Sequence, residues 1–219
     1  SISDLSNYHT QREDTVKGIK YGAGNGNAAL KNVSSIQDLG NHRVKITYSS
    51  KASEVQNGMC FQSRPTVRDH AGTFFWKSKD ITMTSLDIHF LHGFGMVGQH
   101  SENITMDDVD FEAPKESGRT TAGYADFVQM SGCKGTINIS NCTFAGPHDD
   151  PINIHGTFNT VTAISSDRRT ITVQYNHNET AGFPNFFEGD EIEFMTKGNM
   201  ITVEDSVRTV TKVDGPDGM

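Results

Sequence analysis

An internal repeat constrains the fold of this chain more than any other feature of the sequence. Residues 80–88, 103–111 and 136–144 align with one another along their whole length. The first two segments begin 23 residues apart and the last two begin 33 apart, so the second unit carries an insertion at residues 114–122. A repeat of this length is typical of folds in which one structural unit stacks on the next.

Each repeat predicts two strands joined at a corner, because apolar residues alternate on both sides of one polar residue. The corner residues are Ser85, Asp108 and Asn141. A third strand is predicted after each pair, with apolar positions at Phe94 and Met96, at Val128 and Met130, and at Ile152 and Ile154. The ends of these third strands are placed at equivalent glycines, which are Gly98, Gly132 and Gly156.

Three short strands in a turn of 23 residues predict an all-β fold, namely a right-handed parallel β-helix. One turn cannot bury its inward side chains alone, whereas turns stacked about 4.8 Å apart share a continuous core. The alternative is a β-sandwich with fortuitous similarity between its strands. The β-helix is predicted over residues 1–158, although residues 1–76 repeat less clearly. Within that part, residues 43–48 alternate as a strand, and residues 74–76 are expected to pack at the start of the regular turns.

The character of the sequence changes after Phe158. Residues 160–175 predict a hairpin, and residues 188–195 and 200–213 alternate as further strands. Such strands are typical of a small barrel. We therefore predict a β-barrel-like module over residues 159–219, which is incomplete because the sequence ends without a capping feature.

The composition excludes several classes of function. The net charge of −8 disfavours nucleic acid as a partner, since nucleic-acid binding needs clustered lysine and arginine. No apolar run approaches the roughly 18 residues of a transmembrane helix. The chain begins with a polar stretch, as either a mature protein or a trimmed one would. Its three cysteines, Cys60, Cys133 and Cys142, cannot all pair and match no zinc pattern. Neither a cofactor nor a structural metal is expected.

The aligned turns suggest a group of carboxylates on one wall. His92, Asp126 and Asp150 each precede the glycine at the end of a third strand by six residues, and Asp149 adds another carboxylate. Equivalent positions stack in a β-helix, so Asp126 and Asp150 should have neighbouring backbones. Neighbouring carboxylates repel, and one of them commonly keeps its proton near neutral pH. The group can then supply both an acid and a base to one bond.

Further polar residues are candidates for substrate binding. Asn153 and His155 alternate with Ile152 and Ile154, so they are expected to point outward beside the carboxylates. Arg64 and Arg119 are candidates because the loops that carry them could hang over the same wall. Two other functions stay open on these residues. A calcium-dependent polysaccharide lyase would use the aspartates as ligands and Arg119 as base, and a non-catalytic β-helix would only bind carbohydrate.

The run at residues 141–157, with its Asp-Asp-x-x-Asn-x-His-Gly core, resembles glycoside hydrolase family 110. Residues 101–104 and 124–127 are similar to other turns of that family. The resemblance covers residues 60–160 well and the following module more loosely. It implies release of a terminal α-1,3-linked galactose with inversion and without a metal. Asp126, Asp149 and Asp150 would be the catalytic carboxylates. The roles within this set are our own assignment: Asp149 is the general acid, and Asp126 with Asp150 holds and deprotonates the water.

The same resemblance implies where such an enzyme works and what it meets. Its partner would be a glycan that ends in α-galactose, with no insertion into a membrane; homo-oligomer formation is left open. The expected location is secreted, periplasmic or at the cell surface of a bacterium. Members of the family are several hundred residues long, and their β-helix resumes after the barrel. A chain that stops at the barrel lacks part of the substrate wall, so this fragment could be inactive.

Overall fold

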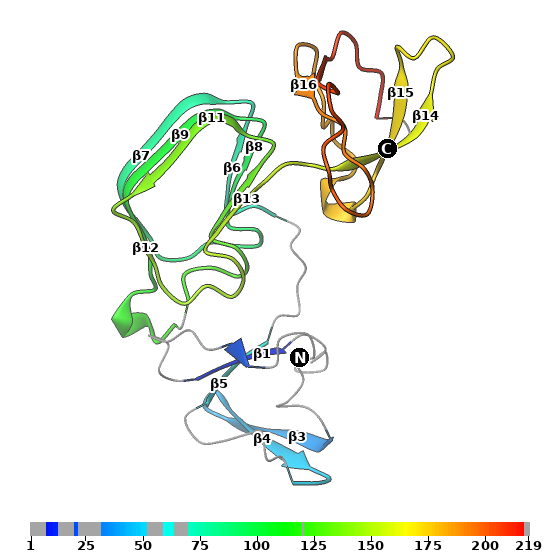
Figure 1. Ribbon diagram of the computed structural model, residues 1–219. Helices are drawn as coiled ribbons and strands as arrows, with labels where there is room; N and C mark the ends of the chain where they lie inside the picture. Colours follow the sequence, from blue (N-terminus) through cyan, green and yellow to red (C-terminus); the bar gives the residue numbers. More distant parts are fainter. Residues whose placement is uncertain are drawn as a thin grey trace. The chain divides into compact units, whose positions relative to one another are not determined.

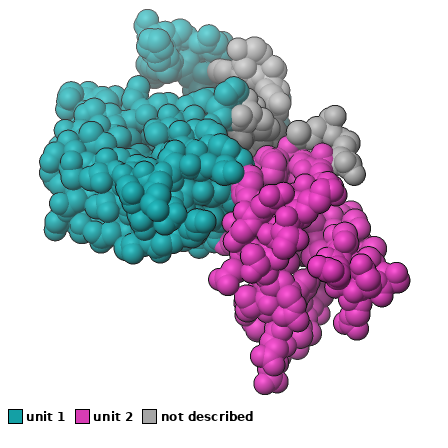
Figure 2. All heavy atoms as spheres, turned by 90° about the horizontal axis from the view of Figure 1, so that it is seen from above, with its two compact units in different colours: residues 1–155 teal, residues 156–219 magenta. Residues whose placement is uncertain are grey.

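The computed structural model describes residues 8–12, 20–21, 32–51, 59–63, 70–119 and 121–216. Nearly all of their regular structure is β, as predicted, and the two helices among them are single 3₁₀ turns, η2 (Lys115–Ser117) and η3 (Asn178–Thr180). Neither is long enough to cross a membrane. The chain divides into two compact units, Ser1–His155 and Gly156–Met219 (Figure 2).

Two parallel sheets form the centre of the first unit (Figure 1). One contains β6 (Thr73–Trp76), β8 (Met96–Gln99), β10 (Val128–Ser131) and β13 (Ile152–His155), in the spatial order β13-β10-β8-β6. The other contains β7 (Lys79–Ile88), β9 (Glu102–Phe111), β11 (Lys134–Ser140) and β12 (Thr143–Phe144). In this second sheet β9 pairs with the other three strands. The chain passes from one sheet to the other and back, so each turn adds to both.

The register of the second sheet confirms the predicted repeat. Ile104 of β9 pairs with Ile81 on one side and Ile137 on the other. The predicted corners are confirmed as well. Ser85, Asp108 and Asn141 all have left-handed backbone conformations, with φ of 50°, 57° and 53°. Short polar side chains adopt this conformation more readily than other non-glycine residues, and this explains why the corners could be found in the sequence.

The register of the first sheet differs from the prediction. Met96 pairs with Val128, and Gly98 pairs with Met130. The predicted matches of Phe94 with Val128 and of Gly98 with Gly132 were therefore wrong by two residues. Gly98 occupies an inward position where a Cβ atom would lie 2.3 Å from the Phe75 ring and 2.6 Å from the Met130 sulfur. It is glycine because the core has no room there, and it does not end the strand.

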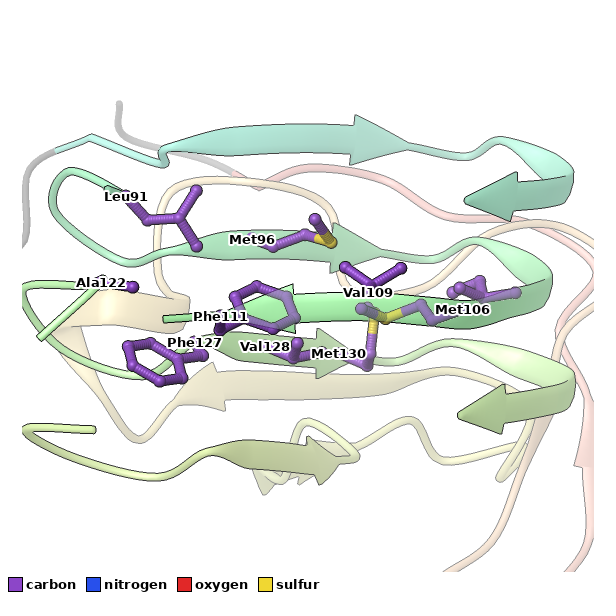
Figure 3. Close-up of a cluster of buried hydrophobic side chains, with 10 residues drawn as sticks. Leu91, Met96, Met106, Val109, Phe111, Ala122, Phe127, Val128 and Met130 are labelled. Carbon is purple, nitrogen blue, oxygen red and sulfur yellow. The ribbon is translucent and has the colours of Figure 1, made fainter. Parts of the chain in front are cut away.

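The core lies between the two sheets and is filled by apolar residues from successive turns (Figure 3). The Phe111 ring stacks against Phe127 and Phe144, with centroid distances of 5.5 Å and 5.0 Å. Burial of each such side chain contributes about 1.5–3 kcal/mol. Phe75 packs against this core, as expected for the start of the regular turns, and so do the free cysteines Cys133 and Cys142.

The remaining strands of the first unit are antiparallel. β1 (Tyr8–Arg12) pairs with β2 (Lys20–Tyr21) and with β5 (Met59–Ser63). β3 (Val33–Gly40) and β4 (Arg43–Tyr48) form a hairpin, and β4 coincides with the predicted strand at residues 43–48.

The second unit consists of short antiparallel ladders. β14 (Asn159–Ile164) pairs with β15 (Ile171–Tyr175), so the predicted hairpin is confirmed. β16 (Glu191–Ile192) pairs with β17 (Arg208–Thr209). Both strands fall inside the ranges predicted to be extended, but each is only two residues long.

Candidate active site

Asp126 and Asp150 lie side by side, just before two paired strands of successive turns. Val128 pairs with Ile152 in the parallel register of β10 and β13. The backbone N–H of Phe127 donates a hydrogen bond to the carbonyl oxygen of Asp150 at 3.0 Å. The backbones of the two aspartates are therefore neighbours in successive turns, as the sequence predicted.

The side chain of Asp126 is buried, with 2% of its surface exposed. The Asn153 side-chain amide donates a hydrogen bond to its Oδ2 at 3.2 Å. The main-chain carbonyl oxygen of Asp126 lies close to Gly95, and a Cβ atom added to Gly95 would be only 2.1 Å from that oxygen. Gly95 has φ of +72°. Two residues thus fix the position of Asp126: the Asn153 amide binds its side chain, and Gly95 leaves room for its main-chain carbonyl group.

Asp149 and Asp150 have different surroundings from Asp126. Asp149 is partly buried and Asp150 is exposed to solvent. Asp150 lies two residues before β13, between bends at Asp149 and Pro151. The three carboxylates thus range from buried to exposed. Unequal solvation of neighbouring carboxylates is the usual means by which a hydrolase separates an acid from a base.

The outward face of β10 and β13 adds neutral polar groups. Asn153 pairs with Gln129, and His155 pairs with Ser131. The Gln129 Nε2 atom lies 3.3 Å from His155 Nε2, while Gln129 Oε1 is buried and accepts no hydrogen bond within the described part of the chain. Gln129 was missed in the sequence, although it alternates with the inward Val128 and Met130 and could have been found by that parity. The side chain of His148, beside Asp149, is also buried and was missed.

His92 does not occupy the position predicted for it. Leu91 bridges to Gly123, and the Tyr124 N–H donates to the Leu91 carbonyl, so His92 lies level with Tyr124. The predicted equivalence of His92 and Asp126 was therefore wrong, for the same two-residue shift that moves Gly98. His92 is exposed, and its ring centroid lies 6.2 Å from that of His70.

Of the two predicted arginines, only Arg119 belongs to the described part of the chain. Arg64 lies outside the described residues. Arg119 belongs to the insertion predicted at residues 114–122, and its guanidinium carbon lies 5.0 Å from the centre of the Phe90 ring. This cation–π contact orients Arg119. Among residues 70–119 and 121–216, and the shorter described stretches before them, no three His, Cys, Asp or Glu side chains are grouped to hold a metal ion.

Comparison with known proteins connects this geometry to one family of enzymes. The model of the GLAA-B beta-barrel domain II matches residues 170–216. Alpha-1,3-galactosidase A of Streptomyces avermitilis is 47% identical over 88% of this chain and 31% of its own length. The chain is homologous to the α-1,3-galactosidases. The enzyme of the same name from Bacteroides thetaiotaomicron is 42% identical over 74% of this chain and 28% of its own length.

These relatives confirm the predicted resemblance to glycoside hydrolase family 110. The barrel match falls within the module predicted at residues 159–219. Similarity to an α-1,3-galactosidase B, also of Bacteroides thetaiotaomicron, is lower, at 37% over 48% of the chain. The chain spans about a third or less of the length of the α-1,3-galactosidases it matches.

Proposed function

We propose that this chain carries the catalytic carboxylates of a glycoside hydrolase that releases terminal α-1,3-linked galactose from glycans. One observation carries the proposal: Asp126 lies beside Asp150 in register, and Asn153, three residues after Asp150, donates a hydrogen bond to the Asp126 carboxylate. The relatives named α-1,3-galactosidase supply the substrate class.

The scaffold of this enzyme is a right-handed parallel β-helix, which lies within the predicted range of residues 1–158 and is formed by the strands from β6 to β13. The strands before β6 are antiparallel and lie outside its turns. A β-barrel-like module over residues 159–219 follows. Two facts support the β-helix: strands of both sheets pair in parallel, and successive turns of the chain add to each sheet. A β-helix presents equivalent positions of successive turns on one wall, and this is the arrangement that the aspartates require.

The reaction is hydrolysis with inversion and without a metal. Asp149 donates a proton to the leaving oxygen, and Asp126 with Asp150 orients and deprotonates the water. Inverting glycosidases separate the acid and base carboxyls by about 6.5–9.5 Å, which leaves room for that water. Adjacent strands lie only about 4.8 Å apart. The carboxylates must therefore diverge through their side chains, and the direction of Asp126 toward Asn153, while Asp150 faces solvent, is consistent with such divergence.

Asn153 and His155 bind sugar hydroxyls from the outward face of β13, and Gln129 joins them through its contact with His155. Arg64, Arg119 and His92 remain candidates to contact the substrate from the surrounding loops. Terminal α-galactose on a glycan is the proposed partner, and the proposed location is outside the cytoplasm of a bacterium.

The test is hydrolysis of a panel of α-galactosides. NMR spectra recorded during the reaction show which anomer of galactose is released before the two anomers equilibrate. The Streptomyces avermitilis relative serves as positive control. We expect β-galactose from α-1,3-linked ends, unchanged activity with a chelator, and loss of at least a hundredfold in Asp149→Asn. Asp87→Asn, an exposed aspartate on the other sheet, is the matched control. Absence of galactose from every substrate, while the relative is active, refutes hydrolysis by this chain.

The same panel separates the rival functions. A calcium-dependent lyase would give unsaturated products and lose all activity with a chelator. A non-catalytic module would bind the glycans without turnover, and Asp149→Asn would then change only the affinity.

A further inference from the structure

The outward face of the four-stranded sheet changes from aromatic to polar across its width. Inward residues of these strands, such as Met96, Val128 and Met130, belong to the core, so the residues that alternate with them point outward. The register aligns the outward residues in two rows. The first row is Phe74, Val97, Gln129 and Asn153, and the second is Trp76, Gln99, Ser131 and His155.

The aromatic end of this surface is formed by Phe74 and Trp76 of β6. Phe74 is 56% exposed, and its ring centroid lies 6.4 Å from that of the partly buried Trp76. Trp76 also meets the His100 ring edge-on at 5.2 Å. One exposed phenylalanine is ordinary on a protein surface. Two adjacent aromatic side chains that share a sheet face with a polar site are the usual lining of a small-molecule site.

The charges of the two rows indicate which ligand fits. None of their eight side chains is that of Lys, Arg, Asp or Glu. Such a surface offers no counter-charge to an anionic or cationic polymer. It offers side-chain amides to hydroxyl groups, and aromatic faces to the apolar face of a sugar ring, while Ser131 in the second row is buried.

We propose that Phe74 and Trp76 form a subsite for a sugar ring beyond the terminal galactose, in a neutral oligosaccharide that lies across the sheet. The subsite rests on the proposed function, which places the terminal galactose at Asp126 and Asn153. With adjacent strands about 4.8 Å apart, β6 lies roughly 10–14 Å from β10 and β13. Val97 on β8 lies in the row between them and is 7% exposed.

The chain contains a single tryptophan, so its fluorescence reports directly on this subsite. The 219-residue chain with Asp149→Asn, which prevents turnover, is titrated with a linear trisaccharide that ends in α-1,3-linked galactose, and separately with galactose. We expect the trisaccharide alone to change the Trp76 emission. Phe74→Ala should weaken trisaccharide binding about tenfold, since it removes one aromatic face. Leu39→Ala, which removes an apolar side chain of similar exposure from the β3–β4 hairpin, should leave the affinity unchanged.

The outcomes separate the subsite from the hydrolase. Unchanged Trp76 emission with the trisaccharide, the same emission change with galactose, or unchanged affinity in Phe74→Ala would overturn the subsite. If the trisaccharide changes the emission but the unsubstituted chain hydrolyses no galactoside, the subsite stands and the proposed hydrolysis fails. A thermal melt of Phe74→Ala that matches the parent chain shows that the lower affinity does not come from unfolding.

Discussion

The turn that contains β10 and the turn that contains β13 share one register but differ in burial. Val128 and Met130 of β10 are fully buried, whereas their partners Ile152 and Ile154 of β13 are 38% and 52% exposed. The difference follows from the sheet order, because β10 has a neighbour on each side, whereas among the strands that the structure describes β13 pairs with β10 alone. The same difference separates the carboxylates. Asp126 precedes the buried strand, and Asp149 and Asp150 precede the exposed one.

This comparison suggests a division of work within the candidate site. A buried carboxylate in a packed turn has a fixed position, which suits a group that must orient water. Carboxylates in a more open turn are accessible to solvent and, in the proposed function, to substrate. The arrangement therefore combines a fixed group with accessible ones, and the following substitutions test whether the two turns differ as the burial indicates.

The largest effect is expected from Gly95→Ala. The new Cβ atom would lie 2.1 Å from the carbonyl oxygen of Asp126 and 2.8 Å from that of Phe127, in a backbone with φ of +72°. Main-chain atoms cannot move aside as side chains do, so the buried turn must shift. We expect a loss of about 3 kcal/mol or more in the free energy of unfolding, measured in urea. Gly156→Ala, whose Cβ atom meets nothing within 4 Å, is the control and should stay within about 0.5 kcal/mol. Equal stability of the two variants would show that the turn at Asp126 is not tightly packed.

Truncation of paired core residues compares the two strands directly. Met130→Ala removes a fully buried side chain and is expected to cost about 3 kcal/mol. Ile154→Ala, at the register partner, removes a side chain that is half exposed and should cost about 1 kcal/mol. Chemical unfolding of both variants measures the difference. A cost for Ile154→Ala as large as that for Met130→Ala would mean that β13 is buried as deeply as β10.

The hydrogen bond between Asn153 and Asp126 links the two turns through the site itself. Asn153→Ala removes a donor from a buried carboxylate, so we expect a loss of about 1–2 kcal/mol in stability. Asp150→Ala, an exposed neighbour in the same motif, should change stability by less than about 0.5 kcal/mol. Unfolding in urea distinguishes the two. A neutral Asn153→Ala would indicate that this amide does not contribute to holding the buried carboxylate.

Much of this fold could be predicted from the sequence because its corners need a left-handed backbone. Ser85, Asp108 and Asn141 recur at one place in each turn for that reason, and they set the register of the second sheet. Gly98 gave no comparable signal. The sequence alone does not distinguish a glycine that ends a strand from a glycine that is required because the core is crowded. Because Gly98 was aligned with Gly132, His92 was aligned with Asp126 and not with Tyr124, beside which it lies.

The candidate site was predicted where it depends on register and missed where it depends on packing. Asp126 and Asp150 stand at one level because Val128 pairs with Ile152, and this alternation is visible in the sequence. The contact of Gln129 with His155 and the burial of His148 follow from three-dimensional packing. Arg119 reaches Phe90 for the same reason, through a loop whose path no periodicity describes.

The smallest effect is expected from the polar corner of the second sheet, which ties residues 136–144 to β9. The Ser140 hydroxyl and the Asn141 amide donate hydrogen bonds to Asp107 Oδ1 at 2.8 Å and 2.7 Å. These bonds lower the pKa of Asp107 in the folded protein. A carboxyl with a lowered folded pKa stabilises the fold above its unfolded pKa, about 3.9, and the contribution is lost as pH falls through the folded value.

Urea midpoints of the parent chain, measured from pH 6 downward, should therefore decrease once the pH is lower than about 4. In Ser140→Ala the part of this fall that comes from Asp107 should be smaller. Ser34→Ala, whose hydroxyl donates to the Thr47 carbonyl oxygen and not to a carboxylate, should keep the parent profile. Identical profiles in Ser140→Ala and the parent would mean that this corner does not couple the stacked turns.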